Sequence, residues 1–108
     1  MIKYVAMLRK REGLSREEFL SYWQGVHAAL ARKLPGVRRY VISPAVSLPG
    51  TRGQPRFDGL AELWFDDLEA FRAAFATPQG RAAVADLANF AQTEALVSVV
   101  TEEIPILT

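Results

Sequence analysis

Two side chains in this sequence could move a proton and stabilise the charge left behind. His27 is the only histidine of the chain, and Tyr40 follows thirteen residues later. An imidazole, with a reference pKa of about 6.5, can both accept and donate a proton near neutrality. A tyrosine hydroxyl can donate a hydrogen bond to a carbonyl or a developing enolate oxygen. The pair predicts acid–base catalysis, with His27 moving the proton and Tyr40 polarising an oxygen.

Both residues also have a structural interpretation. His27 could be a core histidine whose ring nitrogens are bonded to the backbone or to a carboxylate. Tyr40 could be an ordinary strand aromatic with its hydroxyl at the rim of the sheet.

Three further residues are candidates for substrate binding, namely Trp23, Glu62 and Trp64. The tryptophans could line a pocket or fill the core, since an apolar stripe produces the same spacing. Glu62 lies inside an otherwise apolar segment, where it could orient His27 or act as a second carboxylate. Alternatively it forms a salt bridge with Arg38 or Arg39 on a neighbouring strand.

The helix expected to carry His27 has clear start and stop signals. Ser15 with Glu18 three residues later is a capping-box pattern, and Pro35-Gly36 ends the helix. At about 100° per residue, one apolar stripe contains His27. Its members are Phe19, Trp23, Val26, His27, Leu30 and Leu34.

Strands are predicted over residues 2–8, 38–43, 57–65 and 94–103. The first is apolar on both faces, which predicts a central strand buried on both sides. Asp66 is the expected N-cap of a second helix, broken at Thr77-Pro78, where a new N-cap and first helical position follow. The loop from Pro44 to Gln54 is long enough to be functional or mobile. Residues expected to face inward from the broken helix are Leu68, Phe71, Phe75, Val84, Leu87 and Phe90 or Ala91, with its end near Gln92.

The predicted order β-α-β-β-α-β is the ferredoxin-like α+β pattern, an antiparallel four-stranded sheet with the helices on one face. The 108 residues suit one domain, 1–108. The other sheet face would be bare, and a large apolar face is not stable in water. We therefore expect a homodimer whose two sheets pack face to face.

Composition excludes several other classes of function. The chain has no cysteine, one histidine and no HxxxH or acidic calcium-loop spacing, so no metal site is expected. A formal charge of +1 and a third strand, FDGLAELWF, without a basic residue argue against nucleic acid. No nucleotide-binding or G-x-S-x-G motif is present, and Gly50 to Gly53 lacks a following phosphate-binding helix. Without a signal peptide or a membrane span, a cytoplasmic location is expected.

The chain resembles the EthD family, named for ethyl tert-butyl ether degradation, of the dimeric α+β barrel superfamily. The resemblance rests on F-x3-W-x3-H from Phe19 to His27, then Pro35-Gly36 and Tyr40. The resemblance continues at residues 62–65, 77–80 and 86–90, and so covers nearly the whole chain. Only the loop after Ser43 does not contribute to it. Relatives in the superfamily include cofactor-free isomerases, cyclases, decarboxylases, monooxygenases and haem-degrading enzymes. Likeness to the muconolactone-type isomerases would place His27 in the acid–base position with Tyr40 beside it.

Two functions follow as hypotheses. The first is a cofactor-independent enzyme of a catabolic or secondary pathway, acting on a small apolar carbonyl or aromatic compound as an isomerase, decarboxylase, cyclase or monooxygenase-like oxidoreductase. The second is a non-catalytic protein that binds a small hydrophobic ligand or assists an enzyme of a degradation pathway.

Overall fold

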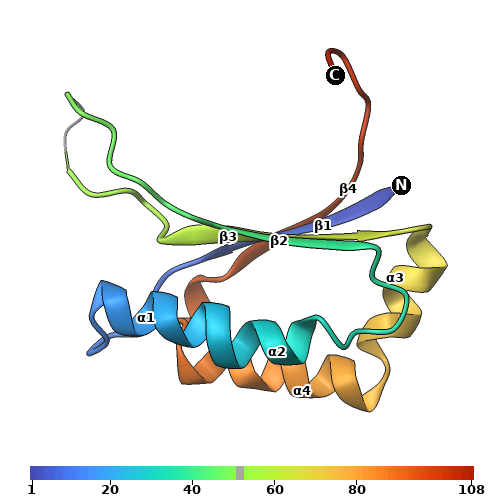
Figure 1. The fold of residues 1–108 in the computed structure, drawn as a ribbon, viewed down its shortest axis with the longest axis horizontal. Coiled ribbons are helices and arrows are strands. Elements are labelled where there is room, and N and C mark those ends of the chain that lie inside the picture. Colours follow the sequence, from blue (N-terminus) through green and yellow to red (C-terminus); the bar gives the residue numbers. More distant parts are fainter. Residues whose placement is uncertain (51–52) are drawn as a thin grey trace.

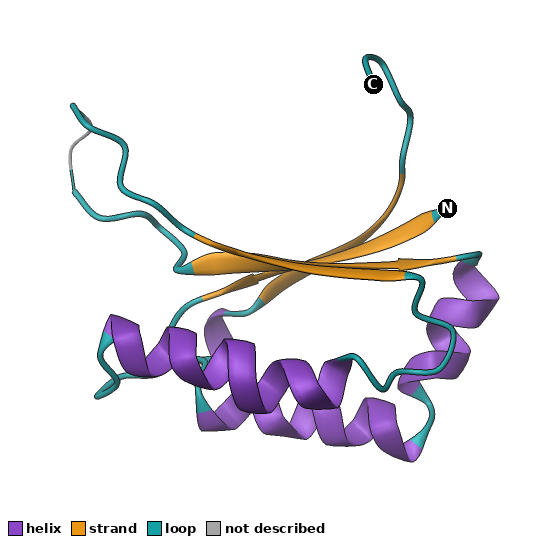
Figure 2. Ribbon diagram, viewed as in Figure 1, coloured by secondary structure: helices purple, strands orange, loops and turns teal. Residues whose placement is uncertain are grey.

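The protein is a four-stranded antiparallel sheet with all its helices packed on one face (Figures 1 and 2). The computed structural model describes residues 1–50 and 53–108. The sheet order is β2-β3-β1-β4, so β1 is central as predicted. The strands are β1 (Ile2–Leu8), β2 (Arg39–Pro44), β3 (Gly59–Phe65) and β4 (Val97–Glu102). The ferredoxin-like α+β prediction is confirmed, and strand boundaries differ from the predicted ones by a few residues.

The first helical segment begins with the predicted capping box. The Ser15 hydroxyl accepts from the Glu18 amide at 3.0 Å, and the Glu18 carboxylate accepts from the Ser15 amide at 2.9 Å. The segment comprises α1 (Arg16–Tyr22), a π-helical turn (Trp23–His27) and α2 (Ala28–Ala31). Gly36 has a φ of 79°, a left-handed conformation that suits glycine just past a helix.

The π-helical turn changes which side chains face the core. Each residue of a π turn advances by less than the angle of an α-helix, so the stripe drifts across this stretch. Val26, predicted to face inward, is 50% exposed instead, while Ala31 is buried. Trp23 and His27 remain on the buried side.

The second helical segment breaks where predicted, but its details need four corrections. The helices are α3 (Leu68–Phe75) and α4 (Pro78–Asp86), so α4 ends before the predicted end near Gln92 and is followed by 3-10 turns at Leu87–Asn89 and Thr93–Ala95. Thr77 caps α4, with Pro78 in its first turn. Asp67, not Asp66, caps α3, because its carboxylate accepts from the Ala70 amide. Leu68 and Val84, predicted to face inward, are 43% and 51% exposed.

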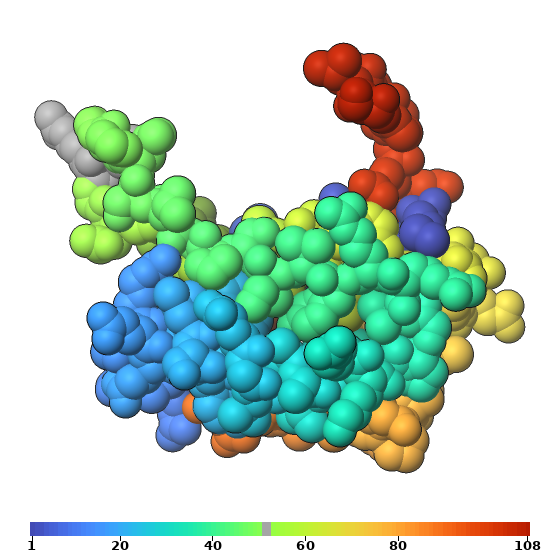
Figure 3. Space-filling view, in the orientation of Figure 1, coloured from blue at the N-terminus to red at the C-terminus, as the bar shows by residue number. Residues whose placement is uncertain are grey.

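The face of the sheet opposite the helices is uncovered in the protomer. Met7 on β1 is 36% exposed, so this strand is not buried on both sides as predicted. On neighbouring β4, Val97 and Val99 are also exposed. The loop after β2 and the segment after β4 both project on this uncovered side (Figures 1 and 3). The predicted loop from Pro44 to Gln54 lies in part outside the described residues.

One glycine in β3 leaves room for the largest core side chain. A Cβ atom on Gly59 would lie 2.6 Å from Trp23 Cζ3 and 2.9 Å from the Ser43 carbonyl oxygen. Trp23 itself is fully buried. The glycine therefore lets the indole approach the sheet closely, in the region where Tyr40 and His27 share a pocket with it.

Candidate active site

His27 is buried between the helices and the sheet. Its side chain is at the end of the π-helical turn, a geometry often associated with functional sites. The whole residue is only 7% exposed, and its ring centroid lies 4.8 Å from that of Phe90. An imidazole in such surroundings needs a polar partner.

That partner is Asp86, the last residue of α4. His27 Nδ1 lies 2.9 Å from Asp86 Oδ2. The other carboxylate oxygen accepts from the Tyr22 hydroxyl at 2.6 Å and from Asn89 Nδ2 at 3.0 Å. The carboxylate is thus held by three side chains, and its orientation toward His27 is fixed.

The hydrogen bonds determine the protonation of the pair. Burial raises the pKa of Asp86, but the bonds from Tyr22, Asn89 and His27 outweigh it, and the pKa is lowered. The carboxylate is therefore ionised and can only accept, which assigns the proton of neutral His27 to Nδ1. Burial lowers the pKa of His27 and outweighs the raising effect of Asp86. At neutral pH, His27 is consequently neutral, with a basic Nε2.

A small apolar pocket adjoins this ring. Its volume is about 60 Å³, and His27, Trp23 and Tyr40 contribute to its wall. Within the described part of the chain, His27 Nε2 makes no hydrogen bond, so it is the ring atom available to a bound molecule. The rest of the wall is largely aliphatic and includes Ala6, Leu8, Ala31, Leu34, Ala61 and Leu63.

Tyr40 and Trp23 bring two unpaired donors to the pocket. Among residues 1–50 and 53–108, the Tyr40 hydroxyl and the Trp23 indole nitrogen are the buried side-chain polar atoms that lack a hydrogen-bond partner. Burial raises the pKa of Tyr40 to about 12, although the nearby Trp23 N–H acts in the opposite direction. Tyr40 therefore remains a hydrogen-bond donor throughout the physiological pH range.

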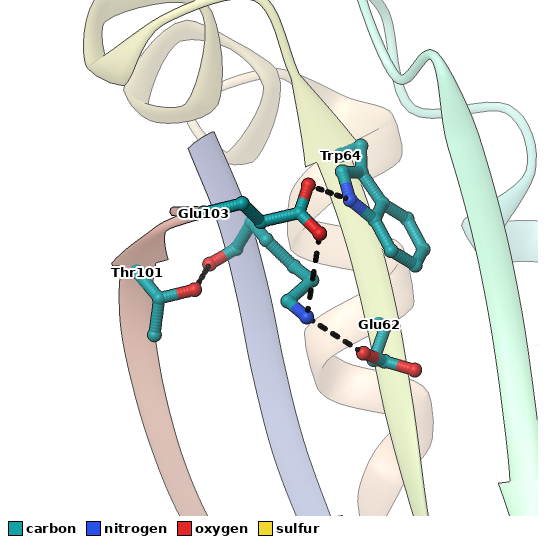
Figure 4. A network of polar contacts seen from close by, with 5 residues as sticks. Glu62, Trp64, Thr101 and Glu103 are labelled. Atoms are coloured by element: carbon teal, nitrogen blue, oxygen red, sulfur yellow. Dashed lines mark hydrogen bonds and ion pairs between the residues drawn. The ribbon is translucent and has the colours of Figure 1, made fainter. Parts of the chain in front are cut away.

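The structure does not bring Glu62 and Trp64 together with His27. Both lie on the uncovered face of the sheet, because side chains alternate along β3 and Leu63 packs in the core. Glu62 pairs with Lys3 at 3.0 Å, and Trp64 Nε1 donates to Glu103 at 2.7 Å (Figure 4).

The predicted pairing of Glu62 with Arg38 or Arg39 is wrong, because Glu62 pairs with Lys3 and both arginines have other partners. Arg38 instead bonds Asp66 through two nitrogens, at 3.1 and 2.7 Å. The Arg39 guanidinium lies over the Trp64 ring at 4.7 Å from its centroid.

A larger, polar groove lies elsewhere, near the loop that follows β2. Its volume is about 660 Å³. Lys10 donates from its ammonium to the Leu14 carbonyl, Arg16 donates to the Ala45 carbonyl, and Asp58 accepts from the Lys10 amide. None of the buried unpaired side-chain donors of the described residues lines this groove. No group of three or more potential metal ligands occurs in the described residues.

Comparison with known sequences identifies the family. The EthD domain model matches residues 11–94, more than half of the chain. The chain belongs to the EthD family. An uncharacterized 11.0 kDa protein from the thcB-thcC intergenic region of Rhodococcus erythropolis is 36% identical over 73 residues, covering 68% of this chain and 69% of that protein.

Solved structures agree with the EthD assignment and the fold. A Bacillus halodurans EthD family protein superposes with a TM-score of 0.83 at 30% identity, over 96% of this chain and 99% of that one. A dimeric ferredoxin-like protein of Bacteroides fragilis has a TM-score of 0.67 at 20% identity, covering 94% and 95%. A mutant of SnoaB, a cofactor-independent oxygenase of Streptomyces nogalater, has a TM-score of 0.67 at 19% identity, covering 98% and 95%. The last two show the fold alone.

Asp86, Tyr22 and Asn89 are the site residues of this EthD protein to which sequence reasoning assigned no role. One signal was available for Asp86. It shares a helical face with Ala83 and Phe90, both buried, and an acidic residue in such a stripe requires a buried partner. The identity of that partner could not be read from the spacing.

No helix in the described part of the chain is long and apolar enough to cross a bilayer.

Proposed function

We propose that this EthD-family protein is a cofactor-independent acid–base enzyme acting on a small, partly apolar carbonyl or phenolic compound. The observation that carries the proposal is the pairing of buried, neutral His27 with ionised Asp86 beside an apolar pocket. An imidazole held at Nδ1 presents Nε2 as a base, and the carboxylate stabilises the imidazolium that forms.

The proposed step is removal of one proton. His27 Nε2 takes a proton from a carbon next to a carbonyl, or from a phenolic hydroxyl. The oxygen that gains negative charge accepts a hydrogen bond from Tyr40, whose hydroxyl has no other partner in the described structure. The resulting enolate or phenolate is a common first intermediate of isomerisation, decarboxylation, cyclisation and oxygenation. One structural neighbour of the same fold is described as a cofactor-independent oxygenase, which supports oxygenation as one member of this range.

A deuterium-exchange screen tests the proposal without knowledge of the natural substrate. Small enolisable ketones and lactones are incubated with the protein in D2O, and loss of C–H signals is followed by proton NMR. We expect protein-dependent exchange at the acidic carbon of at least one class. Saturable ligand binding without any exchange would instead favour the accessory-protein hypothesis.

We also propose that a second copy of the chain covers the uncovered sheet face. The motivation is the exposed apolar side chains of Met7, Val97 and Val99, and structural neighbours described as dimeric ferredoxin-like proteins support it. Light scattering after size exclusion should give a dimer at micromolar concentration. Val99→Lys should give a monomer, whereas Val26→Lys, at a site of similar exposure on the helical side, should remain dimeric. A monomeric parent protein would contradict the proposal.

A further inference from the structure

The pocket is lined by two buried hydrogen-bond donors that have no acceptor in the described structure. Buried donors in proteins nearly always have partners. Two other aromatic donors follow that rule, since Trp64 Nε1 donates to Glu103 and the Tyr22 hydroxyl donates to Asp86. Trp23 Nε1 and the Tyr40 hydroxyl do not, although both are buried.

The two unpaired donors lie in one place. Both residues line the pocket that His27 also lines, and the indole N–H is near enough to the phenol to influence its pKa. The Trp23 N–H is close enough to the Tyr40 oxygen to lower the pKa of Tyr40, but the two groups do not form a hydrogen bond of normal geometry. An indole nitrogen cannot accept, so the Tyr40 O–H would lack an acceptor in any case. An acceptor atom from a bound molecule would satisfy both.

We propose that the Trp23 N–H and the Tyr40 O–H together bind a single oxygen atom of the substrate, which is a neutral phenol or enolisable carbonyl compound. This inference rests on the proposed function, because it names the substrate class of the same pocket. It assigns Trp23 a binding role beyond its packing in the core.

The lack of cationic side chains around the pocket indicates that the substrate binds in its neutral form. The pocket is lined by no lysine or arginine among the described residues, so a permanent anion would lack a counter-charge. A neutral phenol or ketone avoids that cost. Its proton moves to His27 Nε2, and the electron pair of the broken O–H or C–H bond becomes the oxyanion held by the two donors. The imidazolium then pairs with Asp86, and the net charge of the complex is unchanged.

The volume indicates how such a molecule would lie. A pocket of about 60 Å³ is well below the roughly 300–1,000 Å³ of sites that enclose a whole small-molecule ligand. It therefore encloses only the reacting end of a substrate. Val84, which lines the pocket and is half exposed, marks the side on which the remainder would extend.

The test uses 4-nitrophenol, whose absorption spectrum distinguishes the phenol from the phenolate. Titration of the protein at a pH where the free compound is mostly neutral should produce the phenolate spectrum on binding. Trp23→Phe and Tyr40→Phe, which keep an aromatic ring and remove one donor, should each weaken the affinity by about tenfold, the factor that corresponds to one good hydrogen bond. Trp64→Phe, which removes a donor bonded to Glu103 on the opposite face, should change the affinity less than twofold.

Three results would overturn the inference. These are unchanged affinity in both Trp23→Phe and Tyr40→Phe, no binding of 4-nitrophenol to the folded parent protein, or tighter binding of benzoate than of 4-nitrophenol. Circular dichroism shows whether each variant is folded. If Trp23→Phe does not fold, the result for Tyr40→Phe decides, because the Tyr40→Phe change removes only one oxygen atom. The deuterium-exchange screen is a separate measurement, so donor-dependent binding without exchange would refute only the catalytic function.

Discussion

Replacing His27 by Ala should lower the rate of substrate proton exchange by about 10²–10⁴-fold, the usual contribution of a positioned general base. The physical reason is that, among the described residues, no other histidine and no carboxylate or amine side chain lines the pocket, whose remaining polar side chains are those of Tyr4, Trp23 and Tyr40. The measurement is the NMR exchange rate under saturating substrate, compared with the parent protein.

Loss of the imidazole also removes a partner from a buried carboxylate, so a second variant is needed. In His27→Asn the side-chain amide nitrogen can occupy the place of Nδ1 and still donate to Asp86. We expect the same loss of exchange with less loss of thermal stability than in His27→Ala. Exchange within tenfold of the parent rate in both folded variants would remove His27 from the role of base.

Local signals in the sequence predicted much of the fold. The capping box at Ser15 and Glu18, the Pro35-Gly36 stop and the Thr77 cap before Pro78 depend on residues three or four positions apart. Such interactions are set by the chain itself and are little affected by distant packing. The same holds for the alternation of strands and helices, from which the ferredoxin-like arrangement follows.

The incorrect predictions concern features that depend on three-dimensional packing and not on neighbouring residues in the sequence. Both faces of β3 carry large apolar residues, with Leu60 and Trp64 on one side and Leu63 and Phe65 on the other. Period-two alternation was therefore too weak to show that Glu62 faces away from His27. The π-helical turn, which carries Val26 out of the stripe, likewise has no clear sequence signal.

The candidate site could be predicted only in part. His27, Trp23 and Tyr40 share a pocket, as the spacing of the first helix and second strand suggested. The carboxylate partner comes from a helix 59 residues further along the chain. A contact over that separation depends on how the two helices pack, and a single sequence contains no direct measure of it.

Replacing Asp86 by Asn should lower kcat/KM by about 100-fold at neutral pH and move the acidic limb of its pH profile to lower pH. The rate falls because a neutral amide stabilises the imidazolium less and does not fix the tautomer. The limb moves because two influences oppose each other in the parent: burial lowers the pKa of His27, and Asp86 raises it. Without the carboxylate only the lowering influence remains, so His27 stays neutral at more acidic pH.

The limb of the parent protein should itself lie below pH 6.5, the reference value, because burial is the larger of the two influences. The variant Glu62→Gln tests whether Glu62 supports the His27 imidazolium, as the sequence suggested, or pairs with Lys3, as in the structure. If Glu62 supported the imidazolium, its variant would shift the limb downward, whereas pairing with Lys3 on the opposite face predicts no shift. A limb that moves to higher pH in Asp86→Asn would contradict the assigned pair.

The free energy of unfolding should also depend on pH through His27, and the sign of this dependence can be measured. The pKa of His27 is lower in the folded protein than in the unfolded chain, so the unfolded chain binds more protons as the pH falls below about 6.5. The free energy of unfolding should therefore decrease on acidification, and this decrease should stop once the pH is below the folded pKa. In Asp86→Asn the folded pKa is lower still, which extends the decrease to more acidic pH, while His27→Ala should lack it. Thermal melts between pH 5 and 7 isolate this effect, because the carboxylates of lowered pKa at Asp86, Asp66 and Glu18 reduce stability only as the pH approaches their unfolded values near 4.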